Sequence, residues 1–177
     1  MSIATRERTY DWDDPTPTVL AGVDRDGLTV LQAIRAGTLP LPPALKTLDI
    51  EPLEADPGRV SFSLDPGEFH LNPFGIVHGG VLTTMLDTAM GCAVHSLLPA
   101  AVGYLTSELN VRFVRPALLT SGPLVCTGEV VHLGNTRAIA AARIVDVKEG
   151  SSPSPAEPVF YAGPEMPHPA RPGRRHH

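Results

Sequence analysis

The pattern of apolar and polar positions predicts one long, buried helix near the middle of the chain. Within residues 81–97, apolar side chains recur at the spacing of one helical face. The stripe consists of Leu82, Leu86, Ala89, Ala93 and Leu97. The other faces of this segment are also small or apolar, which is typical of a helix enclosed by other structure.

A second, shorter helix is predicted at residues 28–36, where Gly37 suits the position just after a helix. Prolines at positions 40, 42 and 43 follow, and they cannot continue that helix because proline lacks the N–H donor.

Period-two alternation predicts the strands. Val60, Phe62 and Leu64 alternate with serines, and the residues from Asp56 to Gly58 form a turn signal between two strand-like runs. The turn residues Gly134 and Asn135 predict a second antiparallel hairpin. The expected strands are residues 45–55, 59–64, 107–114, 124–133 and 137–147.

This order of elements predicts an α+β domain in which an antiparallel sheet wraps around one long central helix. We expect residues 1–26 to form a flexible, polar N-terminal arm and residues 27–147 to form the domain. Residues 148–177 are a Pro-rich C-terminal segment, and a final strand at 159–162 is expected to be short, displaced or missing.

Composition narrows the class of function. The chain has 177 residues, 42% of them hydrophobic, and a net charge of -5, which fits one globular domain. Lys and Arg cluster only at the extreme C-terminus, so nucleic acid is not the expected partner. Cys92 and Cys126 form neither a disulfide framework nor a CxxC motif. The start has no signal-peptide run, and residues 88–107 lack charge but are broken by Pro99, so we expect a soluble, cytoplasmic protein without a membrane span.

Asp87 is the only ionisable residue of the stretch 81–94. Burying a carboxylate costs several kcal/mol unless donors or water meet it, so packing alone seldom explains one in a buried helix. It is either a functional group or an inert, hydrogen-bonded residue at a dimer seam.

His78, Gly79 and Gly80 directly precede the helix. The first N–H groups of a helix lack partners within it, and glycines let a ligand approach closely, so this turn can hold an anion or a developing oxyanion. An ordinary glycine-rich turn is the alternative. Together with a carboxylate about two turns along, the turn suits acyl transfer to water.

The connected motifs resemble the PaaI-type branch of the hotdog-fold thioesterases. They are Asn72-Pro-Phe-Gly-Ile-Val-His78-Gly-Gly80, the acid-bearing helix VLTTMLDTAMGCAVHSLLP, and LTSELNVRFVRPA. The resemblance spans most of residues 27–147, and it implies a hotdog fold and hydrolysis of acyl-CoA to the free acid and coenzyme A.

The resemblance also implies site roles, position by position. Asp87 matches the catalytic carboxylate, as general base or nucleophile, and the Gly79 N–H matches the donor to the thioester oxygen. Asn72 matches an amide that orients water or the carbonyl, and Thr106 a hydroxyl that holds the water from the partner subunit. His78, next to Gly80, matches a structural hydrogen bonder beside the substrate.

The family completes this site across a dimer interface, so a homodimer, or a tetramer built from it, is expected. One departure is Gly91, where a relative has a hydroxyl one turn after its acid.

The remaining candidates concern coenzyme A binding, metal binding and alternative functions. Arg112, Arg115 and Arg137 are candidates for the phosphates of coenzyme A, or else line a solvated sheet edge. The histidines show no zinc-ligand spacing, so we expect no metal and no cofactor. A non-catalytic acyl-CoA-binding protein and a hotdog hydratase or dehydratase stay open as alternatives. The sequence does not specify the acyl group.

Overall fold

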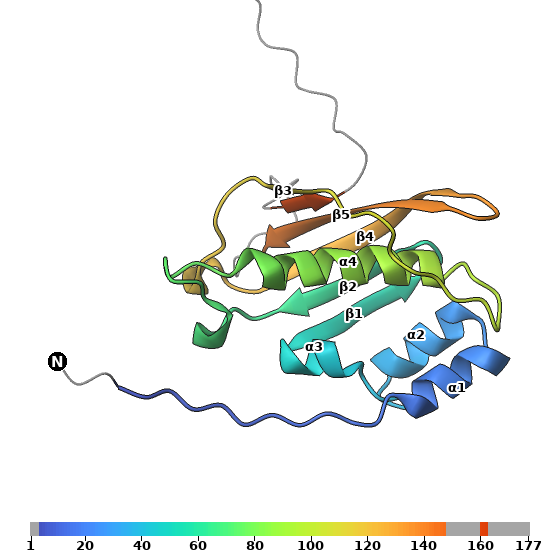
Figure 1. The fold of residues 1–177 in the computed structure, drawn as a ribbon, viewed down its shortest axis with the longest axis horizontal. Coiled ribbons are helices and arrows are strands. Elements are labelled where there is room, and N and C mark those ends of the chain that lie inside the picture. The colour runs from blue at the N-terminus through green and yellow to red at the C-terminus, as the bar shows by residue number, and fades with distance from the viewer. Residues whose placement is uncertain (1–3, 148–159, 163–177) are drawn as a thin grey trace, which may run out of the picture.

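In the part of the chain that the structure describes, a six-stranded antiparallel sheet is built around helix α4, Gly79–His95. The structure is a computed structural model that describes residues 4–147 and 160–162. The order across the sheet is β1-β2-β4-β5-β6-β3 (Figure 1). The strands are β1 Ile50–Asp56, β2 Arg59–Leu64, β3 Val111–Phe113, β4 Leu124–Leu133, β5 Ala138–Asp146 and β6 Phe160–Ala162.

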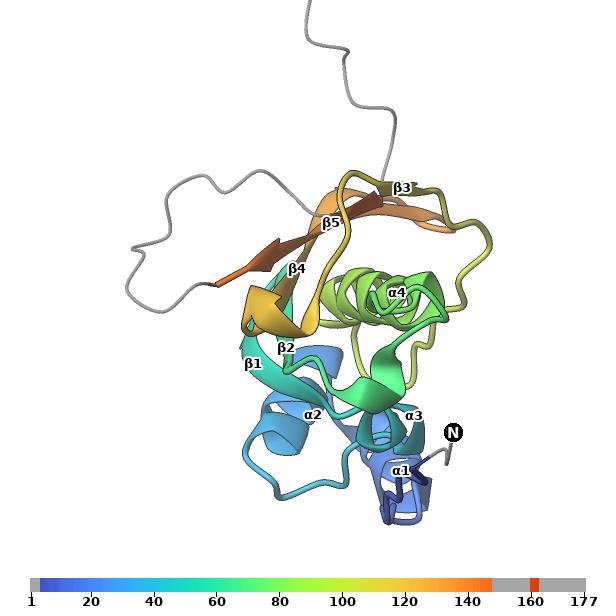
Figure 2. The same cartoon turned by 90° about the vertical axis from the view of Figure 1, so that its left-hand side faces the viewer.

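Helix α4, Gly79–His95, lies against the concave face of this sheet. Seen almost along its axis, the sheet curves around it from β1 to β3 (Figure 2). The predicted stripe is buried except at its end, where Leu97 lies beyond the helix and is 37% exposed. The core is formed by Leu82, Met85, Leu86, Ala89 and Ala93 of α4 with Val60, Phe62, Leu64, Leu124, Cys126 and Ile144 of the sheet. The arrangement confirms the predicted hotdog fold class.

Strand β4 approaches the helix backbone so closely that it needs a glycine. A Cβ on Gly128 would lie 2.3 Å from the carbonyl oxygen of Ala89. The sheet can therefore close onto the middle of α4 only because this position carries no side chain.

The remaining helices pack near β1 (Figure 1). They are α1 Thr16–Asp24, α2 Gly27–Arg35 and α3 Pro43–Thr47, and the short 3-10 turns are η1 Glu68–His70 and η2 Leu119–Ser121. Helix α2 confirms the prediction at residues 28–36. Its start is capped by the Asp26 side chain, which accepts from the Thr29 N–H, and Gly37 follows with a φ of 71°.

Three details differ from the sequence-based expectations. Residues 16–24 of the predicted flexible arm form α1, which contains no fully buried residue and so has no strong apolar stripe. Residues 43–47, part of them expected in a strand, form α3, because proline is favoured in the first turn of a helix. The strand expected at 107–114 is shortened to β3, since only the three-residue β6 pairs with it.

The shortening of β3 changes the surroundings of Phe113. Its side chain is 55% exposed, and β3 is the last in the sheet order of the strands that the structure describes. The final strand β6 is short, as expected, and lies between β5 and β3. None of the helices described reaches the length and apolar character that crossing a membrane requires.

Candidate active site

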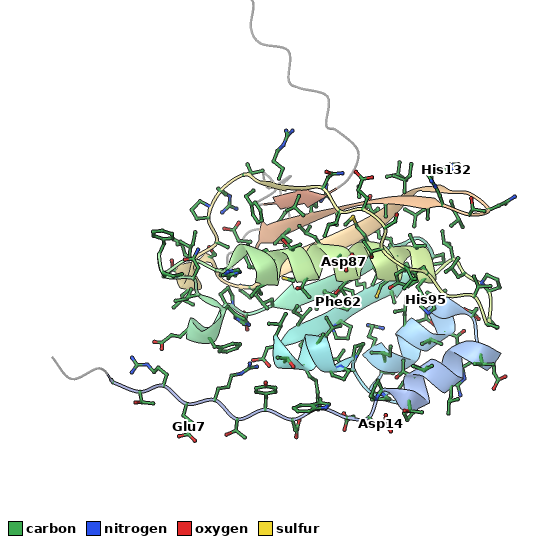
Figure 3. All side chains as sticks on the ribbon, viewed as in Figure 1. Glu7, Asp14, Phe62, Asp87, His95 and His132 are labelled. Carbon is green, nitrogen blue, oxygen red and sulfur yellow. The ribbon has the colours of Figure 1, made fainter. Side chains whose placement is uncertain are left out.

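Asp87 meets a hydroxyl donor in the middle of α4. The Thr106 Oγ1 donates to Asp87 Oδ1 at 2.8 Å, and Asp87 is partly buried, near the centre of the helix in Figure 3. Thr106 belongs to the irregular segment that runs from the end of α4 to β3. The donor stabilises a carboxylate that burial alone would disfavour. The resemblance implied that this hydroxyl comes from the partner subunit, but here it contacts Asp87 of its own chain.

Tyr104 covers the helix one turn beyond Asp87. A Cβ on Gly91 would lie 2.7 Å from the Tyr104 hydroxyl oxygen, so the missing side chain at 91 admits the tyrosine. Burial, with smaller contributions from Cys92 and Asp87, raises the pKa of Tyr104. The ring also lies 5.7 Å from the His95 ring, measured between centroids. Thr106 and Tyr104 thus lie over the α4 face that carries Asp87, and both remain exposed.

Cys92 is a partly buried thiol that packs against the core, in line with the interpretation of this residue as a packing residue. Burial raises its pKa to about 12, which disfavours the thiolate form that a nucleophile requires.

At the start of α4, one of the two glycine N–H groups is occupied. The His78 Nδ1 accepts from the Gly80 N–H at 2.8 Å and caps the helix. The imidazole is therefore a structural hydrogen bonder, as the motif implied. Gly79 is the first residue of the helix, and its N–H has no partner among the residues described. The Phe113 ring packs beside it, 3.1 Å from where a Cβ on Gly79 would lie.

Asn72 lies at the same end of the helix. Its Oδ1 accepts from the Phe74 N–H at 2.9 Å and from the Ile76 N–H at 3.4 Å, which shapes the loop before His78. In the described part of the chain, no partner is found for the Asn72 Nδ2 donor. The amide is therefore oriented through its oxygen and keeps its NH₂ available.

The four predicted catalytic residues thus form two pairs. Gly79 and Asp87 are eight residues apart in one helix, which is about 12 Å along the axis. An oxyanion donor and a base acting on one carbonyl must each reach within about 3 Å of the reacting atoms. Asn72 and Gly79 on one side, and Asp87 and Thr106 on the other, are too far apart within a single chain.

The two candidate arginines differ. Arg115 makes a bidentate ion pair with Asp146 of β5, with distances of 2.6 and 3.0 Å, and it fixes the chain after β3. Arg112 is exposed on β3 and has no ion pair among the residues described. Within residues 4–147 and 160–162, no group of three or more His, Cys, Asp or Glu side chains is arranged to hold a metal ion.

Comparison with known proteins gives a consistent family. Residues 74–152 match the model of the thioesterase superfamily. A protein of Bacillus halodurans, solved with CoA, shares the fold with a TM-score of 0.59 and 30% identity, over 85% of this chain and 91% of that one. The chain belongs to the thioesterase superfamily.

Two further relatives carry esterase or thioesterase names. A Halobacterium salinarum protein with an esterase name is 38% identical over 100 residues, or 55% of this chain and 60% of the relative. Human acyl-coenzyme A thioesterase 13 is 28% identical over 98 residues, or 55% of this chain and 69% of the enzyme. The alignment therefore spans less than two thirds of the Halobacterium protein. The superfamily match includes Gly79, Asp87 and Thr106, but it starts after Asn72.

Two residues near this candidate site were not predicted from the sequence. Tyr104 packs over Gly91, and a glycine one turn after the acid is the sequence signal for a large side chain above it. His70 contacts the loop before α4 through long-range folding that no local pattern reveals.

Proposed function

We propose that this protein is an acyl-CoA thioesterase that hydrolyses its substrate to a free acid and coenzyme A. The observation that carries the proposal is the carboxylate of Asp87, which Thr106 orients and which is the only charged group of residues 81–94. Membership of the thioesterase superfamily, the CoA-bound relative and human acyl-coenzyme A thioesterase 13 support this class of substrate.

One active site takes its two halves from two protomers. The distance of about 12 Å between Gly79 and Asp87 along α4 supports a site shared between two chains. A second copy, with its α4 running in the opposite direction, brings Gly79 of the partner subunit close to Asp87. The working unit is then a homodimer with two equivalent sites.

The edge of the described sheet at β3 offers a surface for this second copy. Among the strands that the structure describes, β3 is the last one in the order, and an edge strand readily pairs with another chain. The apolar side chains around it are exposed: Val102 44%, Leu105 95%, Phe113 55% and Val114 50%. Pairing of two β3 edges would cover these side chains.

In the proposed reaction, the thioester oxygen accepts the Gly79 N–H, and water attacks the carbonyl carbon. Asp87 takes the proton of that water, while Thr106 and the NH₂ of Asn72 hold water and carbonyl in place. The C–S bond then breaks, and the coenzyme A thiolate leaves with the proton held by Asp87. Direct attack by Asp87 on the carbonyl carbon, followed by hydrolysis of the anhydride, is the alternative use of the same carboxylate.

The chemistry requires neither a metal nor a redox cofactor. Arg112, exposed on β3, is the proposed contact for a phosphate of coenzyme A. Arg115 is proposed to position this strand through its pair with Asp146 rather than to meet the phosphate.

The test is release of thiol from short, medium, long and aromatic acyl-CoAs by the wild type, Asp87→Asn and Asp24→Asn. Asp24 is an exposed carboxylate on α1 and serves as the matched control. We expect release by the wild type and the control, and a loss of at least about 10²-fold in Asp87→Asn. Binding of a CoA ester by a dimeric sample without thiol release would support a binding protein instead.

A further inference from the structure

His70 is a fully buried side chain in η1, the short turn that precedes the loop leading to α4. The residue is 1% exposed, and both ring nitrogens are engaged. The Gly67 N–H donates to Nδ1 at 2.9 Å, and Nε2 lies 2.9 Å from the Leu48 carbonyl oxygen. A carbonyl can only accept and an N–H can only donate, so these contacts require the neutral imidazole with its proton on Nε2.

The backbone of His70 is tied directly to the turn that presents Gly79. The His78 N–H donates to the His70 carbonyl oxygen at 2.8 Å, and a β-bridge pairs Leu71 with Val77. The next contact along the chain is the bond from the Gly80 N–H to the His78 Nδ1. Any movement of His70 therefore changes the position of the residue that caps α4.

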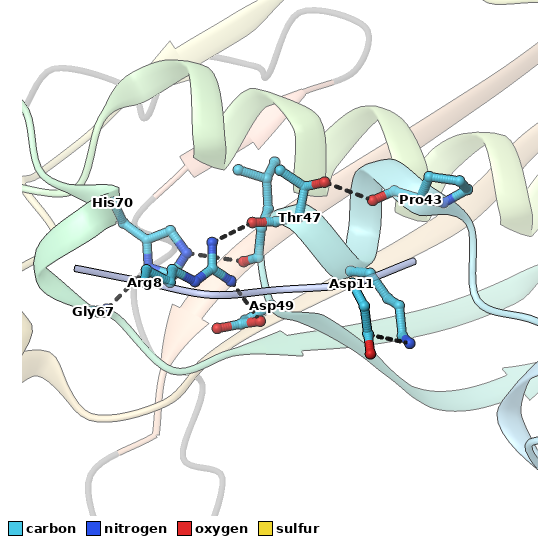
Figure 4. A network of polar contacts seen from close by, with 9 residues as sticks. Arg8, Asp11, Pro43, Thr47, Asp49, Gly67 and His70 are labelled. Atoms are coloured by element: carbon cyan, nitrogen blue, oxygen red, sulfur yellow. Dashed lines mark hydrogen bonds and ion pairs between the residues drawn. The ribbon is translucent and has the colours of Figure 1, made fainter. Parts of the chain in front are cut away.

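The N-terminal arm holds His70 from outside (Figure 4). Arg8 donates to the Thr47 carbonyl oxygen at 2.6 Å and pairs with Asp49 at 2.8 Å. Its guanidinium lies 3.7 Å from the centre of the Phe69 ring, next to His70. The arm thus fastens the residues on both sides of the imidazole.

We propose that His70 is a positioning residue for the oxyanion turn, held in place by the arm through Arg8. The neutral ring fixes the loop at Gly67 and Leu48, the His70 carbonyl fixes His78, and His78 fixes the start of α4, from which the Gly79 N–H points to the substrate. The effect of His70 on catalysis rests on the proposed function. The coupling of His70 to the turn at residues 78–80 does not depend on that function.

Protonation of His70 breaks this arrangement, because a proton on Nδ1 faces the Gly67 N–H donor. The charged groups around the ring are Arg8 from the arm, Asp49 from the junction of α3 and β1, and Glu68 of η1, which is paired with Arg6. Burial lowers the pKa of His70, the Asp49 charge raises it and the Arg8 charge lowers it. Neutral variants of Arg8 and Asp49 should therefore move the titration in opposite directions.

The test follows the ring of His70 and the backbone amides of His78, Gly79 and Gly80 by NMR as the pH is lowered from 8 to 5. We expect the amides to titrate with the midpoint of the ring. The midpoint should rise in Arg8→Gln and fall in Asp49→Asn. In the active dimer, kcat should fall with the same midpoint by at least about tenfold, with little change in KM, because the oxyanion donor acts in the transition state.

His70→Asn is the conservative variant, since its carboxamide oxygen can still accept from the Gly67 N–H but does not titrate. It should keep the amide signals of the turn at neutral pH and lose their pH dependence. Amides of residues 78–80 that do not follow the ring, or midpoints that move in the same direction in Arg8→Gln and Asp49→Asn, overturn the proposal. A wild type without thiol release contradicts the proposed function, whereas the NMR result still decides the role of His70.

Discussion

At the scale of single residues, the N–H of Gly79 is the proposed oxyanion donor, and it can be removed with little other change. It is the first helical residue, a position that proline favours, and His78 before it has the extended ψ of 133° that a following proline requires. Gly79→Pro therefore deletes one N–H. Gly79→Ala keeps it and adds the same Cβ, 3.1 Å from the Phe113 ring.

We expect kcat of Gly79→Pro to be about 10²- to 10³-fold below that of Gly79→Ala, the usual effect of losing one oxyanion donor. The measurement is steady-state thiol release with the best acyl-CoA, after both variants are shown to be dimers. Equal kcat values in the two variants would remove the Gly79 N–H from the mechanism.

Thr106 gives a second prediction at this scale. Thr106→Val keeps the shape of the side chain but removes the donor to Asp87, and a hydrogen bond to a charged group is worth about 1.5–3 kcal/mol. We expect kcat/KM to fall by about 10- to 100-fold, while Thr106→Ser, which keeps the hydroxyl, stays within a few fold of the wild type. A Val variant as active as the Ser variant would mean that the hydroxyl is not needed.

The site was predictable from the sequence only in part. The isolated carboxylate and the glycine turn stand out locally, and the connected motif supplied their roles. The contact of Thr106 with Asp87 of its own chain was not predictable, because it depends on how the irregular segment after α4 folds back. The separation of Gly79 and Asp87 follows from their spacing in one helix.

At the scale of secondary structure, the close contact between β4 and α4 is the most sensitive point of the fold. A Cβ on Gly128 would lie 2.3 Å from the Ala89 oxygen and 2.7 Å from the Met90 nitrogen, and backbone atoms cannot rotate away. Gly128→Ala should lower the free energy of unfolding by about 1–3 kcal/mol or more, because overpacking usually costs this much.

Gly22→Ala in α1 is the matched control, since open space surrounds the new Cβ and alanine favours a helix by up to about 1 kcal/mol. Urea unfolding at fixed protein concentration measures both variants. A Gly128→Ala protein as stable as Gly22→Ala would contradict the close packing of β4 on α4.

The elements themselves were predictable where a period extends over several turns or strand residues. Helix α4, strands β4 and β5 and the hairpin at Gly58 follow from periodicity and turn residues. Helix α1 was not predicted, and none of its residues is fully buried. Alternation predicted a strand at 107–114, but the length of β3 depends on pairing with β6, which is distant in sequence.

At the scale of the whole molecule, the buried His70 and the partly buried His95 predict how stability depends on pH. Burial lowers the pKa of His70 and of His95 from 6.5. Below this value the unfolded chain binds more protons than the folded one, so the free energy of unfolding falls as the pH decreases. The slope is at most about 1.4 kcal/mol per pH unit for each histidine.

Urea unfolding between about pH 7 and pH 5 measures this slope, and His70→Asn should reduce it. A slope that is the same in His70→Asn and in the wild type would show that His70 does not contribute. Protein concentration must be held constant, because dissociation of a dimer adds to the measured stability.

Mixed dimers show whether two protomers assemble one thioesterase site. Asp87→Asn and Gly79→Pro should each be inactive alone. In a mixed dimer, Gly79 of the first protomer and Asp87 of the second form one intact site, so co-expression should restore about a quarter of wild-type thiol release. If the two variants stay inactive after mixed dimers have been isolated, each site lies within one chain and the account is wrong.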